Sequence, residues 1–211
     1  MRTQPSEQIT VYSDYVCPFC YLGRESLSRY QADRADELEI NWQPFDLRHG
    51  KRDPDGSIDH SVDDRKGDDY YEQAKESVRK LQAKYDVEME LDLATDVDSF
   101  SAQIASYYVA DGYPYETWLD FDEAIFAALW QDGRDIGDAN VLAELADEVG
   151  VDADEIRSAL DDETLRAEIE AEWTAAQRQG ISGVPTLAYD GYAARGAVPP
   201  EHLQRLVEGV E

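Results

Sequence analysis

The two cysteines of the chain, Cys17 and Cys20, are separated only by Pro18 and Phe19. Residues three apart share one helix face, about 5 to 6 Å from each other, which is within the range that a disulfide bridges. Residues 9–13 are β-branched and aromatic, as in a buried strand, and Pro18 suits a first helical turn, where its missing N–H is no loss. The pattern predicts a thiol pair at a helix start that forms and breaks a disulfide reversibly.

The two sulfurs differ in position, so we expect them to differ in role. Cys17 is predicted to lie where free backbone N–H groups and the helix dipole stabilise a thiolate, which makes it the attacking sulfur. Cys20, one turn inside, is the candidate resolving thiol. Neither Pro18 nor Phe19 brings a positive charge, so we expect less thiolate stabilisation than a histidine between the cysteines would provide.

Half of a zinc site, or a pair of inert buried thiols, is the alternative to a redox pair. The other zinc ligands would have to come from His49, His60 and His202, none of which is paired at the usual spacing of zinc-binding histidines. We therefore expect no metal. Inert thiols would require the strand, the proline and the cysteine spacing to coincide by chance.

Val184 and Pro185 form the second candidate segment. A proline that begins a strand can hold a cis bond and turn the backbone of the preceding residue outward, although a trans proline on an edge strand fits the residues alone equally well. We expect Val184 to offer backbone hydrogen bonds to a substrate segment beside Cys17, by strand addition.

Asp14, three residues before Cys17, is a candidate to accept or relay the proton of Cys20. Its negative charge would also oppose a thiolate at Cys17. The alternative is a solvated loop acid, one of many in this chain.

Phe19 is a candidate substrate contact at the rim of the site. Three other aromatic residues, Tyr15, Trp42 and Phe45, are candidates for the same apolar rim. The alternative is that these aromatic side chains belong to the core.

The elements that must position these residues follow from periodicity. Residues 38–45 alternate as a second strand after a helix that ends near residue 35, and residues 49–67 have loop composition. Helical spacing covers residues 70–85, 100–112, 114–133, 138–150, with Asp138 as N-cap, and 165–180. Two short strands, joined by an Asp-Gly turn, and a final helix complete the chain.

This order predicts an α/β fold of the thioredoxin-like type, β-α-β then β-β-α, with an inserted all-helical domain. The predicted thioredoxin-like domain is discontinuous, with residues 1–65 and 176–211. Residues 66–175 form the predicted helical insertion.

The charge of the chain excludes functions that need a basic surface. Among 211 residues, 19 Lys and Arg stand against 47 Asp and Glu, a net charge of −28. Nucleic acid and anionic membranes are therefore not expected partners. Because the acids are spread along the chain, we interpret them as an adaptation to concentrated salt, the alternative being an ordinary acidic cytoplasmic protein.

Other function classes and compartments find no sequence support. Residues 1–8 are polar, and no stretch approaches the roughly 20 apolar residues of a membrane span, so we expect a cytoplasmic protein. The glycine-rich nucleotide-binding loops, the zincin motif and the Gly-x-Ser-x-Gly motif of serine hydrolases are all missing from the sequence.

Four segments resemble one known family. Residues 13–23, Ser-Asp-Tyr-Val-Cys-Pro-Phe-Cys-Tyr-Leu-Gly, resemble the active-site stretch of DsbA-like thioredoxin-fold proteins, and of FrnE-type oxidoreductases among them. Residues 42–47 resemble the second strand of that family, residues 133–136 a turn in its helical insertion, and residues 183–187 its cis-proline strand. The resemblance implies thiol–disulfide exchange with Cys17 as nucleophile, Cys20 as resolver, a cis Pro185 and a helical domain covering the site.

The chain also departs from this family. Many relatives have Trp in place of Phe19, and Asn-Thr/Ser-x-x-Ala-His where residues 98–103 are Asp-Ser-Phe-Ser-Ala-Gln, so a contact made by that His is in doubt. Kappa-class glutathione transferases and 2-hydroxychromene-2-carboxylate isomerases share the architecture but usually have Ser in place of Cys17. Retention of both sulfurs favours redox work.

The leading hypothesis is a protein-disulfide oxidoreductase that acts on disulfide- or thiol-containing proteins or small molecules and is recycled by a redox partner. It needs no cofactor, and glutathione is a possible substrate. Two alternatives stay open: a glutathione-dependent isomerase or transferase, and a non-catalytic chaperone-like binding module.

Overall fold

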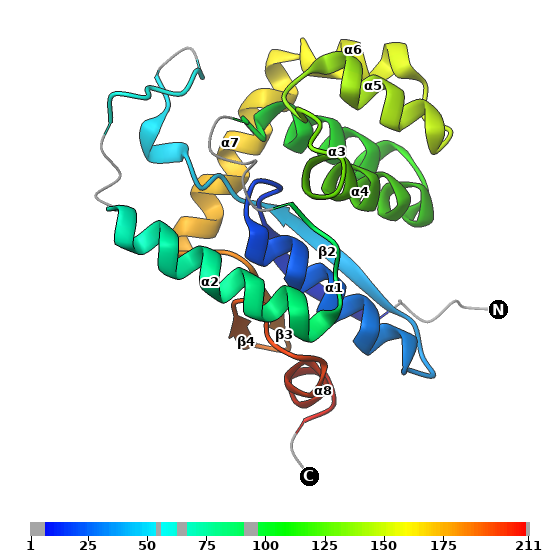
Figure 1. Cartoon of the computed structure of the whole chain (residues 1–211). Coiled ribbons are helices and arrows are strands. Elements are labelled where there is room, and N and C mark those ends of the chain that lie inside the picture. The colour runs from blue at the N-terminus through cyan, green and yellow to red at the C-terminus, as the bar shows by residue number, and fades with distance from the viewer. Residues whose placement is uncertain (1–6, 54–55, 63–66, 91–96, 210–211) are drawn as a thin grey trace, which may run out of the picture.

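The computed structural model describes residues 7–53, 56–62, 67–90 and 97–209 (Figure 1). Its sheet has the strand order β2-β1-β3-β4. Strand β1 (Glu7–Ser13) pairs in parallel with β2 (Leu38–Pro44), with Val11 opposite Trp42. On its other side β1 pairs antiparallel with β3 (Thr186–Tyr189), which pairs antiparallel with β4 (Tyr192–Arg195).

Two helices complete the thioredoxin-like part. Helix α1 (Pro18–Ala32) connects the parallel strands β1 and β2, and α8 (Pro200–Glu208) packs against α1, β3 and β4. The order β-α-β and then β-β-α confirms the predicted α/β fold. Helix α1 is about a turn shorter than the sequence indicates.

The remaining helices lie between β2 and β3 along the chain. After a short 3-10 turn, η1 (His49–Lys51), they are α2 (Asp68–Tyr85), α3 (Phe100–Gly112), α4 (Tyr115–Trp130), α5 (Ala139–Glu148), α6 (Ala153–Leu160) and α7 (Glu163–Arg178). Helices α3 to α6 gather at one end of the molecule, whereas α2 lies along α1 (Figure 1). The division into two domains at residues 65 and 176 stays a prediction.

Local signals account for most helix starts. Asp138, predicted as an N-cap, accepts a hydrogen bond from the Asn140 N–H, and Asp152 does the same for Asp154 at the start of α6. Helix α6 itself was not predicted, because its eight residues place only Ile156 and Ala159 in the core and leave little periodicity to detect.

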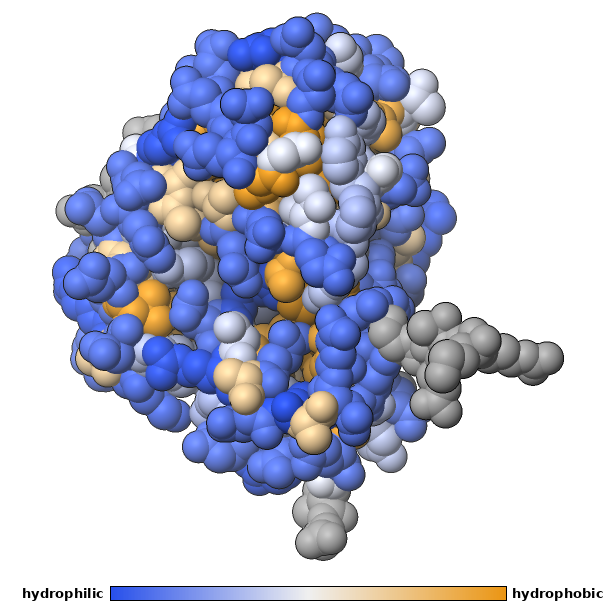
Figure 2. All heavy atoms as spheres, turned by 90° about the vertical axis from the view of Figure 1, so that its right-hand side faces the viewer, coloured by the Kyte–Doolittle hydropathy of each residue, from blue (hydrophilic) through white to orange (hydrophobic). Residues whose placement is uncertain are grey.

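The core fills the space between the sheet and the helices. Strand β1 buries Ile9 and Val11 against it, and the central helices contribute Phe121, Ile125 and Leu129. The face shown in Figure 2 is mostly hydrophilic, with apolar side chains in small separate patches. No described helix is both long enough and apolar enough to span a membrane.

Candidate active site

Both cysteines lie on the first turn of α1, as the sequence predicts. Cys17 is the N-cap residue and Pro18 the first helical residue. The carbonyl oxygen of Cys17 accepts a hydrogen bond of 2.9 Å from the backbone N–H of Cys20, which closes this turn. Both side chains are free thiols, with exposed fractions of 5 % for Cys17 and 1 % for Cys20. Cys17 is therefore the more accessible of the two sulfurs.

The environment of Cys20 holds its proton. Burial raises the pKa of the Cys20 thiol well above its usual value, and the side chain of Cys17 raises it further. The backbone of Asp14 and the side chain of Ser13 act in the opposite direction. Cys20 consequently needs a proton acceptor before it can attack as a thiolate.

The Val184–Pro185 segment lies against Cys17. The Cys17 Sγ is 3.7 Å from the carbonyl oxygen of Val184, and the peptide bond between Val184 and Pro185 is cis. Gly23 permits this approach, because a Cβ there would lie 3.2 Å from the Pro185 Cγ. Residues 167 positions apart are thus brought together at the sulfur.

The aromatic candidates separate into two groups. Phe19 is partly buried and packs against the main core, so part of its ring remains at the surface beside the cysteines. Tyr15, Trp42 and Phe45 are buried, which makes the core alternative correct for them.

Asp14 is fully buried, so the interpretation as a solvated loop acid is wrong. Its Oδ1 accepts hydrogen bonds from the Ser99 hydroxyl at 2.5 Å and the Val16 N–H at 3.3 Å, and its Oδ2 accepts one from the Leu47 N–H at 2.9 Å. Burial raises the pKa of Asp14 to about 6, helped by the negative charge of Asp46 and opposed by these hydrogen bonds. Among the described residues, no hydrogen bond joins the Asp14 carboxyl to either sulfur.

The helical insertion supplies partners of Asp14 that the sequence analysis did not assign. Gln103 donates through Nε2 to Asp14 Oδ1 at 3.4 Å and to Ser99 Oγ at 3.2 Å, while its Oε1 accepts from Trp173 Nε1 at 3.0 Å. Ser99 and Gln103 are four residues apart, at the start of α3, and hence share a helix face. That spacing is a signal for a common target, but nothing local identifies Asp14 as the target.

A second buried network joins the cysteine loop to α4. The hydroxyl of Tyr15 donates to Asp122 Oδ1 at 2.8 Å, and Asp122 Oδ2 pairs with Arg24 Nη2 at 2.6 Å. The Trp130 indole N–H donates to the carbonyl oxygen of Tyr15 at 2.8 Å. These contacts tie the loop before Cys17 to the helical insertion.

Within the part of the chain that the structure describes, no three His, Cys, Asp or Glu side chains are grouped so that they could hold a metal ion.

Solved structures with the same fold include two oxidoreductases and an isomerase. A probable DsbA oxidoreductase from Streptomyces coelicolor is 23 % identical, with a TM-score of 0.75, 96 % of this chain covered and 89 % of that chain. A 2-hydroxychromene-2-carboxylate isomerase is 19 % identical, with a TM-score of 0.74 and coverage of 90 % and 89 %. The cytosolic disulfide reductase DsbM of Pseudomonas aeruginosa is 18 % identical, with a TM-score of 0.61 and coverage of 96 % and 93 %.

Sequence comparison covers nearly the same length. The YwbO protein of Bacillus subtilis (strain 168) is 28 % identical over 200 residues, which are 94 % of this chain and 94 % of that protein. Residues 8–208 match the family described as a DSBA-like thioredoxin domain. This chain therefore belongs to the DsbA-like thioredoxin domain family.

Proposed function

We propose that this protein is a FrnE-type thiol–disulfide oxidoreductase that exchanges disulfides with protein or small-molecule substrates through Cys17 and Cys20. The observation that carries the proposal is the position of the Cys17 sulfur at a helix start, 3.7 Å from the Val184 carbonyl, with Cys20 buried one turn below. Cys17 is the more accessible of the two sulfurs, so it is the one that a substrate disulfide reaches first.

The exchange proceeds in two balanced steps. The Cys17 thiolate attacks one sulfur of a substrate disulfide, the substrate S–S bond breaks, and one substrate sulfur leaves as a thiolate. Cys20 then loses its proton and attacks the Cys17 sulfur, which releases the second substrate thiolate and leaves a Cys17–Cys20 disulfide. The substrate has gained two electrons, and a redox partner returns two electrons to the enzyme. The reverse sequence oxidises a substrate dithiol.

Asp14 is the proposed proton acceptor for Cys20. With a pKa of about 6 it is mostly ionised at neutral pH, whereas the raised pKa of Cys20 keeps that thiol protonated. Because the carboxyl makes no direct hydrogen bond to the sulfur, the transfer is proposed to pass through a water molecule.

The substrate is proposed to bind along the segment before Pro185. Val184 would supply backbone hydrogen bonds to an extended substrate segment, and the surface part of Phe19 would contact its apolar side chains. Leu47 follows β2, and its backbone N–H donates to the Asp14 carboxyl. Its side chain is exposed and therefore adds apolar surface close to the cysteine loop.

Substitution of each cysteine tests the proposal. Cys17→Ser should abolish reduction of a fluorogenic glutathione disulfide, whereas Cys20→Ser should accumulate a mixed disulfide with the probe, visible by mass spectrometry, because the resolving step is blocked. Ser28→Ala, an exposed change on the same helix, should leave the rate unchanged. Full activity of Cys17→Ser would contradict the assigned roles.

A glutathione-dependent isomerase or transferase is the second candidate, favoured by the likeness to a 2-hydroxychromene-2-carboxylate isomerase. The DsbM reductase is also found with glutathione, so bound glutathione alone does not separate the candidates. Saturable binding of reduced glutathione to Cys17→Ser, together with a wild-type protein that exchanges no disulfides, would favour this candidate.

The proposed compartment is the cytoplasm. One fold neighbour, DsbM, is a cytosolic disulfide reductase. In a reducing cytoplasm the pair would be mainly in its dithiol form, which favours reductase or isomerase work.

A further inference from the structure

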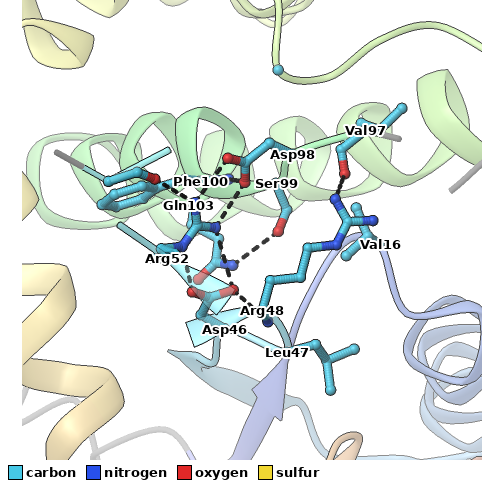
Figure 3. Close-up of polar contacts among 12 residues, drawn as sticks. Val16, Asp46, Leu47, Arg48, Arg52, Val97, Asp98, Ser99, Phe100 and Gln103 are labelled. Carbon is cyan, nitrogen blue, oxygen red and sulfur yellow. Dashed lines mark hydrogen bonds and ion pairs between the residues drawn. The ribbon is translucent and has the colours of Figure 1, made fainter. Parts of the chain in front are cut away.

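Arg52 lies between two aspartates beside the start of α3 (Figure 3). Its Nε donates to Asp46 Oδ2 at 2.6 Å, and its Nη2 and Nη1 donate to the two carboxyl oxygens of Asp98 at 2.7 and 2.8 Å. The side chains of Arg52 and Asp46 are 6 % and 0 % exposed. Charges this deeply buried are costly unless they are paired, so the Arg52 cluster, Asp46, Arg52 and Asp98, is held together as an ionised unit.

One end of the Arg52 cluster fixes the helix that reaches Asp14. Asp98 Oδ1 accepts a hydrogen bond of 3.0 Å from the Phe100 N–H, the first backbone donor of α3. Two polar side chains at this helix start, Ser99 and Gln103, donate to Asp14. The position of Asp98 therefore affects where the Ser99 and Gln103 donors lie relative to the buried Asp14 carboxyl.

The other end of the cluster pairs with a negative charge that acts on Asp14. Asp46 is the group whose negative charge acts on Asp14, and Arg52 is the cation that pairs with Asp46 inside the protein. Other titratable and charged groups around this arrangement include Cys20, which contacts the Asp14 backbone, Arg48, whose backbone N–H donates to Asp46, and Asp98.

We propose that Arg52 is a positioning residue for the redox pair: by neutralising Asp46 and anchoring Asp98, it sets the pH range in which Asp14 is ionised beside Cys20. The inference rests on the proposed thiol–disulfide exchange, and it adds a control site outside the cysteine loop. It assigns a function to a residue that touches neither sulfur.

Opposite charge changes in the cluster should shift the titration midpoint of Asp14 in opposite directions. Arg52→Gln leaves Asp46 without its cation, so Asp14 should keep its proton to a higher pH, by about one pH unit. Asp46→Asn removes the like charge, so Asp14 should ionise at a lower pH, by about one unit. The double variant should return the midpoint close to that of the wild type.

The titration is measured on the complete protein by carbon-13 NMR of its aspartate carboxyls, with Asp14 assigned from the signal lost in Asp14→Asn. The pH profile of exchange activity is recorded on the same variants, and its acidic limb should follow the NMR midpoint. Arg52→Lys, which keeps the charge without the planar fork, should leave the midpoint near its wild-type position. A structural role alone would not give shifts of opposite sign.

Arg34→Gln is the matched control, because it breaks another largely buried ion pair, Arg34 with Glu7, at exposed fractions of 10 % and 33 %. It should lower stability without moving the Asp14 midpoint. If Arg52→Gln does not fold, the isosteric Asp46→Asn still tests the inference. An unchanged or raised titration midpoint of Asp14 in that variant overturns it. The NMR titration needs no activity, so a wild-type protein that exchanges no disulfides would refute the proposed function alone.

Discussion

Asp14, just before α1, and Cys20, on its first turn, are both buried, and burial raises the pKa of both groups. For the acid this has a consequence for stability. The Asp14 carboxyl binds a proton more tightly in the folded than in the unfolded protein. Its favourable contribution to the free energy of unfolding is therefore complete below about pH 4 and is lost as the pH rises through about 6.

Asp14→Asn should therefore remove a pH dependence of stability. The free energy of unfolding of the wild type, minus that of Asp14→Asn, should fall by roughly 3 kcal/mol from about pH 4 to about pH 7. Urea unfolding at a series of pH values measures this difference. The same comparison for Asp132→Asn, at an exposed aspartate, should give a flat line. A difference that rises with pH would mean that Asp14 is not held in the way described.

At the scale of elements, the site depends on how closely α1 approaches the strand that follows Pro185. Gly23, on the second turn of α1, is the point of contact, and a Cβ at this position would lie 3.2 Å from Pro185 Cγ and 3.8 Å from Ala197 Cα. The contact with Pro185 is tighter than ordinary packing. Helix and strand must separate slightly to admit a methyl group.

Gly23→Ala should destabilise the protein by about 1 kcal/mol, because overpacking outweighs the gain in helix propensity. It should also slow disulfide exchange, since Val184 moves away from the Cys17 sulfur. Gly112→Ala is the control: Gly112 ends α3 with no atom within 4 Å of a new Cβ, so that change should be neutral or slightly stabilising. Thermal unfolding and the fluorogenic assay measure both. An unaffected Gly23→Ala would show that the approach is not a constraint.

At the scale of the whole molecule, the chain carries a net charge of −28, and the face shown in Figure 2 is mostly hydrophilic. Repulsion among these charges opposes the compact state at low salt. The Debye length falls from about 10 Å at 0.1 M salt to about 3 Å at 1 M, so concentrated salt removes most of that repulsion. Adaptation to such salt remains our proposal for the acidity.

Tm should rise by several degrees, at least, between low and molar potassium chloride at neutral pH, because about 1 kcal/mol of relieved repulsion moves Tm by roughly 2 to 4 °C for a protein of this size. Near the sequence pI of about 4.2 the net charge vanishes, and the same salt step should have a smaller effect. Differential scanning calorimetry measures both steps. Equal Tm values in low and molar salt at neutral pH would remove the proposal of salt adaptation.

Local interactions account for what the sequence alone determined. The spacing of Cys17 and Cys20, with Pro18 between them, predicts their place at a helix start. The Asp-Gly pair predicts the turn between β3 and β4, in which Asp190 and Gly191 both have positive φ, 46° and 83°. Each of these features depends on contacts within a few residues, which a sequence pattern records directly.

Only the tertiary structure decided the environment of these groups. The carboxyl of Asp14 is buried because Ser99 and Gln103, 85 and 89 residues away, pack over it, and Arg52 meets Asp98 across 46 residues. The sequence around Asp14 is the same for a solvated acid as for a buried one. Burial and the resulting pKa depend on which distant segments pack together, and no local spacing records that choice.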